Sequence, residues 1–152
     1  MLAVEPEPLL RQAAEEEAGK CEVAIEVVDG VAGSLPAADA SQDAAVASLV
    51  LCSVPDQGRA LTELRRVLKP GGELRFYEHV IARGSVPSRL QRLADAQFWQ
   101  PLASGCHKSR DAAAAIERAG FEIERIERFP FSPGAIVPST PHILGVARPL
   151  AG

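Results

Sequence analysis

A helix followed at once by a Pro-Gly-Gly turn and a strand is the pattern that most constrains this fold. Apolar residues between Leu61 and Leu68 recur on one helical face, and Asp56 is a good N-cap ahead of them. The helix is expected to end at Lys69, because Pro70-Gly71-Gly72 forces a turn. The residues Glu73–His79 then predict a strand. A helix that leads directly into a strand is typical of α/β proteins.

Strands and helices are expected to alternate along the rest of the chain. The run Ala44–Leu49 is almost continuously apolar, which is the pattern of a strand buried on both faces of a parallel sheet. The sequence therefore predicts one α/β domain over residues 1–152 with a mostly parallel sheet. The other expected strands are Leu2–Val4, Val23–Val28, Phe121–Phe129 and His142–Ala147, and the other expected helices are Pro8–Ala18, Pro87–Gln100 and Arg110–Ala119, the last capped by Ser109.

Composition excludes several classes of protein. Hydrophobic residues make up 47% of the 152 residues and charged residues 24%, which is typical of a globular domain and not of a disordered chain. The formal net charge of -4 gives no basic surplus for binding nucleic acid or anionic lipid. No apolar run reaches the roughly 18 residues of a membrane helix, so no membrane span is predicted.

The cysteines and the N-terminus bear on the compartment. Cys21, Cys52 and Cys106 are too few and too scattered for a disulfide framework or a CxxC metal site. The opening residues have no basic region followed by an apolar stretch, so they do not resemble a signal peptide. A reducing, cytoplasmic location is expected.

The expected topology indicates which polar residues lie where a ligand would bind. Ligands of an open α/β sheet bind beyond the carboxyl ends of its strands. The residues expected there are Glu5, Asp29–Ala32, Ser48–Ser53 and Glu78-His79, and they should line one crevice. Asp43 begins a strand at the opposite edge and is expected to be structural. From position alone, Glu5 could equally be a solvated loop carboxylate.

The segment Leu35–Val80 resembles the middle of a class I S-adenosylmethionine-dependent methyltransferase of the type 11 group. It has a Leu-Pro, an Asp that opens an apolar strand, and a helix that ends in RVLKPGG before the next strand. The runs LVLCSV, EHV, FWQ and PHILGVA are similar to those of the group that includes animal alkyl-thiol S-methyltransferases. The resemblance implies a Rossmann-like sheet with helices on both faces and S-adenosyl-L-methionine as cofactor.

The same resemblance implies roles for five residues. Glu5 would hold the ribose of the cofactor, and Val31 and Ala32 would meet its adenine. Ser48 and Leu49 would approach its methionine part. Many relatives have Asp at the position of Val31.

One departure from the family concerns its glycine-rich loop. Such methyltransferases begin with a strand and a G-x-G-x-G loop, and no such cluster lies in the first 40 residues here. We expect the domain to be N-terminally truncated, missing the first strand and helix. In the family that strand lies beside Leu2–Val4, so its absence would leave a gap in the sheet. The chain could then start downstream of the true start, receive the strand from another chain by self-association, or rearrange.

The residues near the expected crevice suggest candidate chemistry. His79 is the best candidate for a base that takes a proton from the methyl acceptor, although a hydrogen-bonded loop histidine is an equal alternative. Cys52 could contact the substrate, but a buried small side chain is the commoner role. Trp99 could form an aromatic wall over an apolar acceptor. No metal site is expected, since Cys106-His107 lacks further ligands.

Two functions follow from these features. The first is transfer of a methyl group from S-adenosylmethionine to a small-molecule acceptor, with a thiol as one candidate. The alternative is a non-catalytic remnant of a methyltransferase, or a partner subunit, that does not bind the cofactor alone. Neither function involves nucleic acid.

Overall fold

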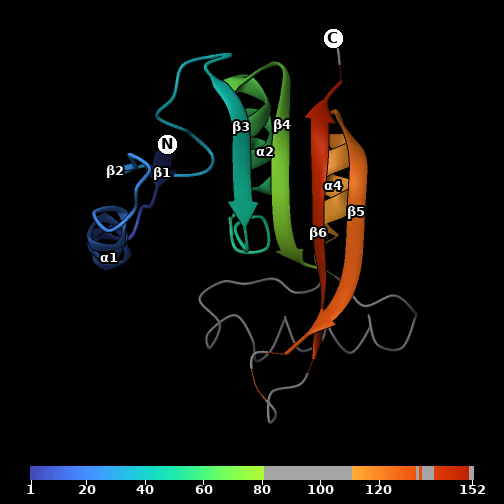
Figure 1. Ribbon diagram of the computed structural model, residues 1–152. Helices are drawn as coiled ribbons and strands as arrows, with labels where there is room; N and C mark the ends of the chain where they lie inside the picture. The colour runs from blue at the N-terminus through green and yellow to red at the C-terminus, as the bar shows by residue number, and fades with distance from the viewer. Residues whose placement is uncertain (81–110, 133, 135–138, 151–152) are drawn as a thin grey trace.

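The computed structural model describes residues 1–80, 111–132, 134 and 139–150 of the chain (Figure 1). These residues form six strands and three helices, which is a mixed α/β fold. In chain order they are β1 (Leu2–Val4), α1 (Pro8–Ala18), β2 (Glu26–Val28), β3 (Gln42–Ser48), α2 (Gln57–Val67), β4 (Leu68–His79), α4 (Ala112–Arg118), β5 (Phe121–Phe131) and β6 (Thr140–Pro149).

The strands form two separate sheets. β1 and β2 pair in parallel, and a larger sheet has the order β3-β4-β6-β5. Within it β3 and β4 are parallel, whereas β6 runs antiparallel to both β4 and β5. The strands β3, β4 and β5 therefore share one direction, and the prediction of a mostly parallel sheet is confirmed with β6 as the exception. β5 and β6 follow each other with a short connection, which allows antiparallel pairing, while parallel neighbours need a longer crossover.

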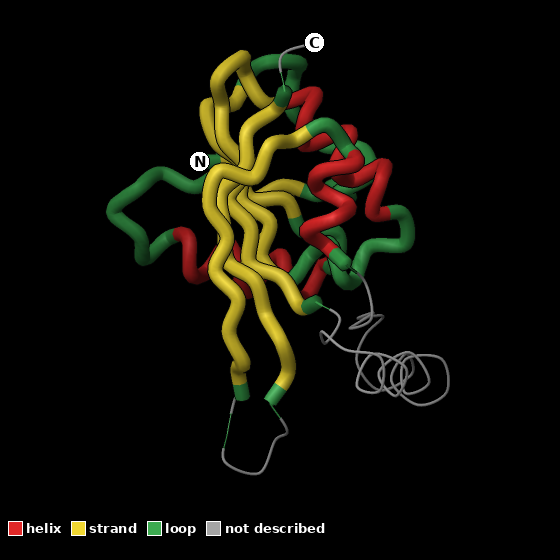
Figure 2. Tube along the Cα trace, turned by 90° about the vertical axis from the view of Figure 1, so that its right-hand side faces the viewer, coloured by secondary structure: helices red, strands yellow, loops and turns green. Residues whose placement is uncertain are grey.

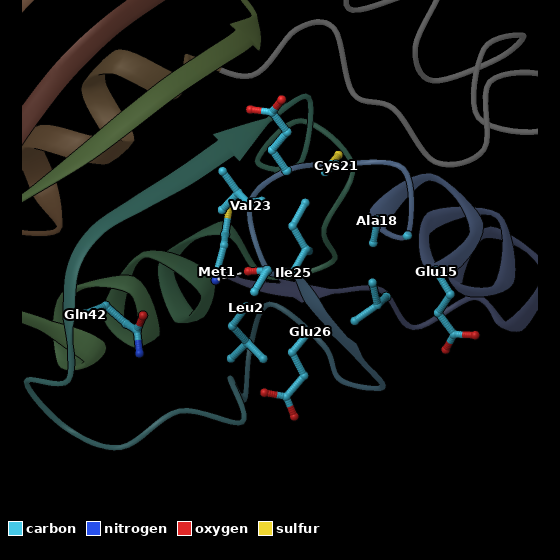
Figure 3. Close-up of a pocket in the computed structure, with 13 residues that line it drawn as sticks. Met1, Leu2, Glu15, Ala18, Cys21, Val23, Ile25, Glu26 and Gln42 are labelled. Atoms are coloured by element: carbon cyan, nitrogen blue, oxygen red, sulfur yellow. Dashed lines mark hydrogen bonds between the residues drawn. The ribbon is translucent and has the colours of Figure 1, made fainter.

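A gap separates the two sheets at the place where a missing strand was expected. Among the described strands, β1 pairs with β2 alone and β3 pairs with β4 alone. A cavity of about 960 Å³ lies between them, lined by Leu2 of β1, Val27 of β2, the end of α1 and Gln42 of β3 (Figure 3). The expectation that Leu2–Val4 lacks a neighbour on one side is confirmed.

One prediction about β3 is wrong. The apolar run at its centre was expected to be buried on both faces, but Val46 is 69% exposed and Ala47 alone in this strand is fully buried. Ala45 and Ala47 face the core, whereas Val46 points to the opposite face of the sheet. β3 is also an edge strand among the described strands of the larger sheet. The apolar sequence of a central strand is thus found at an edge.

The core lies between the larger sheet and the helices α2 and α4, which cover one of its faces (Figures 1 and 2). Burial of each large apolar side chain stabilises the fold by about 1.5–3 kcal/mol. α2 begins at Asp56, whose Oδ1 accepts a hydrogen bond from the Arg59 N–H at 2.9 Å, as predicted for an N-cap. The largest fully buried apolar residues are Phe76, Phe121, Leu51, Leu61, Leu74, Ile116 and Ile143.

The Pro-Gly-Gly segment forms a bulge within β4. Gln42 pairs with Leu68 and Ala44 pairs with Glu73, so residues 69–72 are looped out of the ladder. Gly71 has φ +79°, a conformation that favours glycine. The predicted turn is confirmed, although β4 already begins before it.

Several predicted boundaries are confirmed and others are corrected. Leu2–Val4 and Pro8–Ala18 match the structure, but the apolar stripe of α1 is not buried, since Leu9 is 76% exposed. The second strand is shorter than Val23–Val28 because only its last three residues pair with β1. α4 is capped by Asp111, whose Oδ1 accepts from the Ala114 N–H, and the predicted cap Ser109 lies outside the described residues. The predicted helix 87–100 lies outside them too.

None of the helices in the described part of the chain is long and apolar enough to span a membrane.

Candidate functional site

The residues after β1 and β2 are held together by one arginine. Arg11 donates from Nη1 to the backbone oxygen of Glu5 at 2.9 Å and to Oδ1 of Asp29 at 2.8 Å. The Glu5 carboxylate accepts from the Glu7 N–H through Oε1, and its Oε2 makes no hydrogen bond to the described residues. One carboxylate oxygen of Glu5 is therefore available to a ligand at the end of β1.

Val31 and Ala32 lie in the loop that follows β2. Val31 is 52% exposed and forms an isolated bridge with Ser34. Ala32 is partly buried against the core, and the next carbonyl, of Gly33, accepts a hydrogen bond from Arg59 Nε at 2.8 Å. The loop is thus anchored to α2, while the Val31 side chain offers an apolar surface to solvent.

Ser48 and Leu49 lie where β3 ends beside β4. Ser48 pairs with Tyr77, and the Leu49 N–H donates to the Tyr77 carbonyl at 2.7 Å. Leu49 has φ +55°, which is uncommon for a residue with a side chain. This conformation turns the chain sharply out of β3, and its carbonyl accepts from Ser53 Oγ at 3.2 Å.

A buried carboxyl group contacts the turn formed by Val50, Leu51 and Cys52, directly after Leu49. Glu78 is fully buried and accepts hydrogen bonds from the backbone N–H groups of Val50, Leu51 and Cys52 at 2.8–3.1 Å. Burial raises the pKa of Glu78 to about 8, although the three N–H donors favour its ionised form. The sequence analysis placed Glu78 at this edge but gave it no role of its own.

The turn also brings Cys52 and His79 together. Cys52 Sγ lies 3.9 Å from Nδ1 of His79, and the thiol is 3.4 Å from the carbonyl oxygen of Leu49. The His79 ring packs against that of His142, with ring centroids 4.2 Å apart. Tyr77 stacks on His142, with ring centroids 5.2 Å apart. A base candidate, a thiol and an aromatic wall therefore meet at the carboxyl end of β4.

The predicted site residues form two groups in the described contacts. Glu5 and Asp29 lie together at the ends of β1 and β2, whereas Ser48, Leu49, Cys52 and His79 lie together at the ends of β3 and β4. Neither group lines the cavity between the sheets, which opens at the start of β1 and β3 instead. Trp99 lies outside the described residues, as do Cys106 and His107.

Two features of the site were missed from the sequence. The first is Arg11, which gives no signal beyond its place on a helix. The second is Glu78, for which a signal existed: Leu74, Phe76 and Glu78 alternate along β4, so the carboxyl group had to face the core with the two apolar side chains.

The donor set in the described part of the chain does not suit a metal. It holds no group of three or more His, Cys, Asp or Glu side chains with the geometry of a metal site. It suits part of a nucleoside cofactor better. Glu5 offers a free carboxylate oxygen and Val31 an exposed apolar face, although no glycine-rich loop adjoins them.

Comparison with curated proteins points to one enzyme class. The chain is 42% identical over 111 residues to thiol S-methyltransferase TMT1B of Rattus norvegicus and 39% identical over 110 residues to TMT1A of Homo sapiens. Each match covers 72% of this chain and 45% of the relative, so the chain spans less than half the length of these proteins. A malonyl-[acyl-carrier protein] O-methyltransferase of Pseudescherichia vulneris is 36% identical over 103 residues, covering 68% of this chain and 36% of that protein.

Solved structures agree on the fold. A SAM-dependent methyltransferase from Methanosarcina mazei superimposes with a TM-score of 0.77 at 21% identity, covering 99% of this chain and 82% of that one. The YcgJ protein from Bacillus subtilis gives 0.79 at 16% identity, with 99% and 82% covered. The methyltransferase domain family itself matches residues 1–76, half of the sequence. The chain belongs to the methyltransferase domain family and has its Rossmann-like fold.

Proposed function

We propose that the chain takes part in transfer of a methyl group from S-adenosylmethionine to a small-molecule acceptor, with a thiol as the favoured class. The observation that carries the proposal is the position of His79. Its Nδ1 lies 3.9 Å from Sγ of Cys52 at the carboxyl end of the sheet, where a ligand of this fold is expected. The identity to proteins named thiol S-methyltransferases supports the same acceptor class.

The cofactor would be held by residues of both groups. Glu5 would accept hydrogen bonds from the ribose hydroxyls through its free oxygen, and Val31 with Ala32 would cover the adenine. Ser48 and Leu49 would lie nearest the methionine part. When bound, S-adenosylmethionine supplies a methyl group on a sulfonium, an electrophile that needs positioning more than activation.

His79 would act on the acceptor. A thiol is mostly protonated at neutral pH, and its thiolate is the reactive form. The imidazole would take the thiol proton as the sulfur attacks. Cys52 would form part of the wall against which the acceptor lies, and the exposed Phe131 ring beside His142 would suit an apolar substituent.

The sequence adds two expectations to this proposal. The charge balance favours a small acceptor over nucleic acid, and the scattered cysteines favour a reducing cytoplasm. The edges of β1 and β3 that pair with no described strand support self-association, because an unpaired strand edge is a template for pairing.

Ligand binding and turnover test the proposal in turn. S-adenosylhomocysteine at about 100 times its dissociation constant adds roughly 2.7 kcal/mol of stability, which raises the melting temperature by roughly 5 to 10 °C for a domain of this size. Glu5→Gln should reduce the shift, and Glu22→Gln, an exposed residue away from the strand ends, should leave it unchanged. Methylation of a panel of small thiols is then followed by mass spectrometry.

The two measurements separate the possible outcomes. A thermal shift with thiol methylation is the expected result. A thermal shift without methylation of any thiol would support the cofactor site and would overturn the proposal that the acceptor is a thiol. A cooperative melt with no shift at any ligand concentration would favour the non-catalytic alternative.

A further inference from the structure

Glu78 is a carboxyl group in an apolar setting. It follows Leu74 and Phe76 on the face of β4 that packs against the helices, and all three side chains are fully buried. Burying such a group costs free energy unless it is well hydrogen-bonded. Its presence in the core therefore calls for a specific role.

The hydrogen bonds of Glu78 all go to one turn. Oε1 accepts from the N–H groups of Val50 and Leu51 at 2.9 and 2.8 Å, and Oε2 accepts from that of Cys52 at 3.1 Å. The same turn is closed by hydrogen bonds from the N–H groups of Ser53 and Val54 to the carbonyl of Val50. The N–H groups of Val50, Leu51 and Cys52 take no part in these two bonds, and Glu78 accepts from all three.

Cys52 connects this carboxyl group to His79. Glu78 and His79 are consecutive in β4, so their side chains leave the strand on opposite faces. Both nevertheless reach Cys52: Glu78 binds its backbone N–H, and His79 Nδ1 lies 3.9 Å from its thiol. The backbone of the turn fixes where the thiol lies relative to the imidazole.

We propose that Glu78 is a positioning residue, which holds the turn 50–52 so that the Cys52 thiol and the His79 imidazole stay in contact at the acceptor side of the site. This assignment rests on the proposed function, because it concerns the same edge of the sheet. It deepens that function by naming the group that fixes the wall facing the acceptor. Glu78 acts through the backbone of Cys52 and touches neither acceptor nor cofactor.

The test is a double-mutant cycle read by NMR, without cofactor or acceptor. The ring resonances of His79 are identified by their loss in His79→Gln. In the unmodified chain, Cys52→Ala should displace them, because the thiol lies against the ring. In the Glu78→Gln background, Cys52→Ala should displace the His79 resonances by roughly half as much or less. The reason is that the amide nitrogen of glutamine cannot accept a hydrogen bond from the Cys52 N–H.

A matched control separates positioning from general stability. Glu73→Gln removes a carboxylate from the same strand, where Glu73 pairs with Arg75 and Arg148 near the surface. The displacement caused by Cys52→Ala should be unchanged in this background. An equal displacement in the Glu78→Gln and Glu73→Gln backgrounds would overturn the proposal, whatever the melting temperatures of the variants.

Hydrogen exchange decides the matter if Glu78→Gln does not fold. The amides of Val50, Leu51 and Cys52 in the unmodified chain should be strongly protected, because a buried carboxyl group accepts all three. Exchange near the rate of an unstructured peptide would overturn the proposal. Because neither experiment involves methyl transfer, a chain that fails to methylate thiols can still support or refute this role.

Discussion

Glu63 and Arg66, one turn apart on α2, form an ion pair that fixes the connection between the two sheets. Arg66 Nη2 lies 2.8 Å from Glu63 Oε2, and the same carboxylate oxygen accepts from the Leu35 N–H. Arg66 donates in addition to the carbonyl of Ala37 and to Asp39. The segment 35–39 leads from β2 to β3, so this pair joins the small sheet to the larger one through α2.

Glu63→Gln should destabilise the fold by about 1.5–3 kcal/mol, the range for hydrogen bonds to charged groups. Hydrogen bonding to Arg66 lowers the pKa of Glu63 to about 2. The stabilisation is therefore present above its ordinary pKa of 4.5 and is lost as the pH falls towards 2. Urea unfolding of the unmodified chain and of Glu63→Gln between pH 2 and 7 should show that their difference in unfolding free energy becomes smaller as the pH falls. Glu117→Gln, on the exposed side of α4, is the control, and an equal loss there would contradict the role of the pair.

Glu78 should give the opposite dependence at high pH. Burial raises its pKa from 4.5 to about 8. The folded chain therefore binds this proton more tightly than the unfolded chain, and the associated stabilisation is complete below pH 4.5 and is lost as the pH rises through 8. Comparison of urea unfolding at pH 5, 7 and 9 should show a steeper decline for the unmodified chain than for Glu78→Gln. Parallel declines would argue against a raised pKa.

Gly145→Ala should be among the most damaging single substitutions. Gly145 on β6 lies between Phe76 and Ile126 of the adjacent strands, and an added Cβ would meet the carbonyl oxygen of Arg125 and lie 2.5 Å from Phe76 Cζ. Overpacking of this kind costs about 1–3 kcal/mol or more. Gly58→Ala, in α2, meets only Asp56 at 3.5 Å and should be neutral or stabilise the helix. Thermal unfolding of the two variants gives the comparison, and a neutral Gly145→Ala would contradict the packing.

His79→Gln should lower thiol methylation on the order of 10²-fold at neutral pH, the range for loss of a general base. The deficit should shrink as the pH rises, because the acceptor thiol then ionises without help. An aromatic thiol of low pKa serves as the control acceptor and should be methylated by both chains at similar rates. Equal deficits for both acceptors would assign His79 a binding role and no proton transfer.

Much of the fold could be predicted because local signals were strong. Asp56 marked the start of α2, and Leu2–Val4 and Pro8–Ala18 followed from their apolar spacing, whereas α2 ends at Val67, two residues before the predicted Lys69. The exposure of Val46 could not be predicted in this way. It depends on what covers that face of β3, and local apolar spacing does not show this.

The site was predictable at the level of strand ends and not of contacts. Position in the sheet brought Cys52 and His79 to the same edge, but the turn beside them, with the positive φ of Leu49 and the hydrogen bonds to Glu78, was not predicted. Leu49 lies in an apolar run and carries no residue-type signal for such a turn. Tertiary packing decided its conformation.

The position of β6 has a consequence for synthesis on the ribosome. β6 lies between β4 and β5, although both of these strands precede it in the chain. While Thr140–Pro149 is still inside the exit tunnel, the facing edges of β4 and β5 have no strand between them, and the apolar residues around Phe76 lack one side of their packing. Nascent chains expose such surfaces to aggregation and to chaperones. A ribosome stalled before residue 140 should therefore carry a chaperone-bound chain. One stalled on a linker fused after Gly152, long enough to clear the tunnel, should carry a protease-resistant chain.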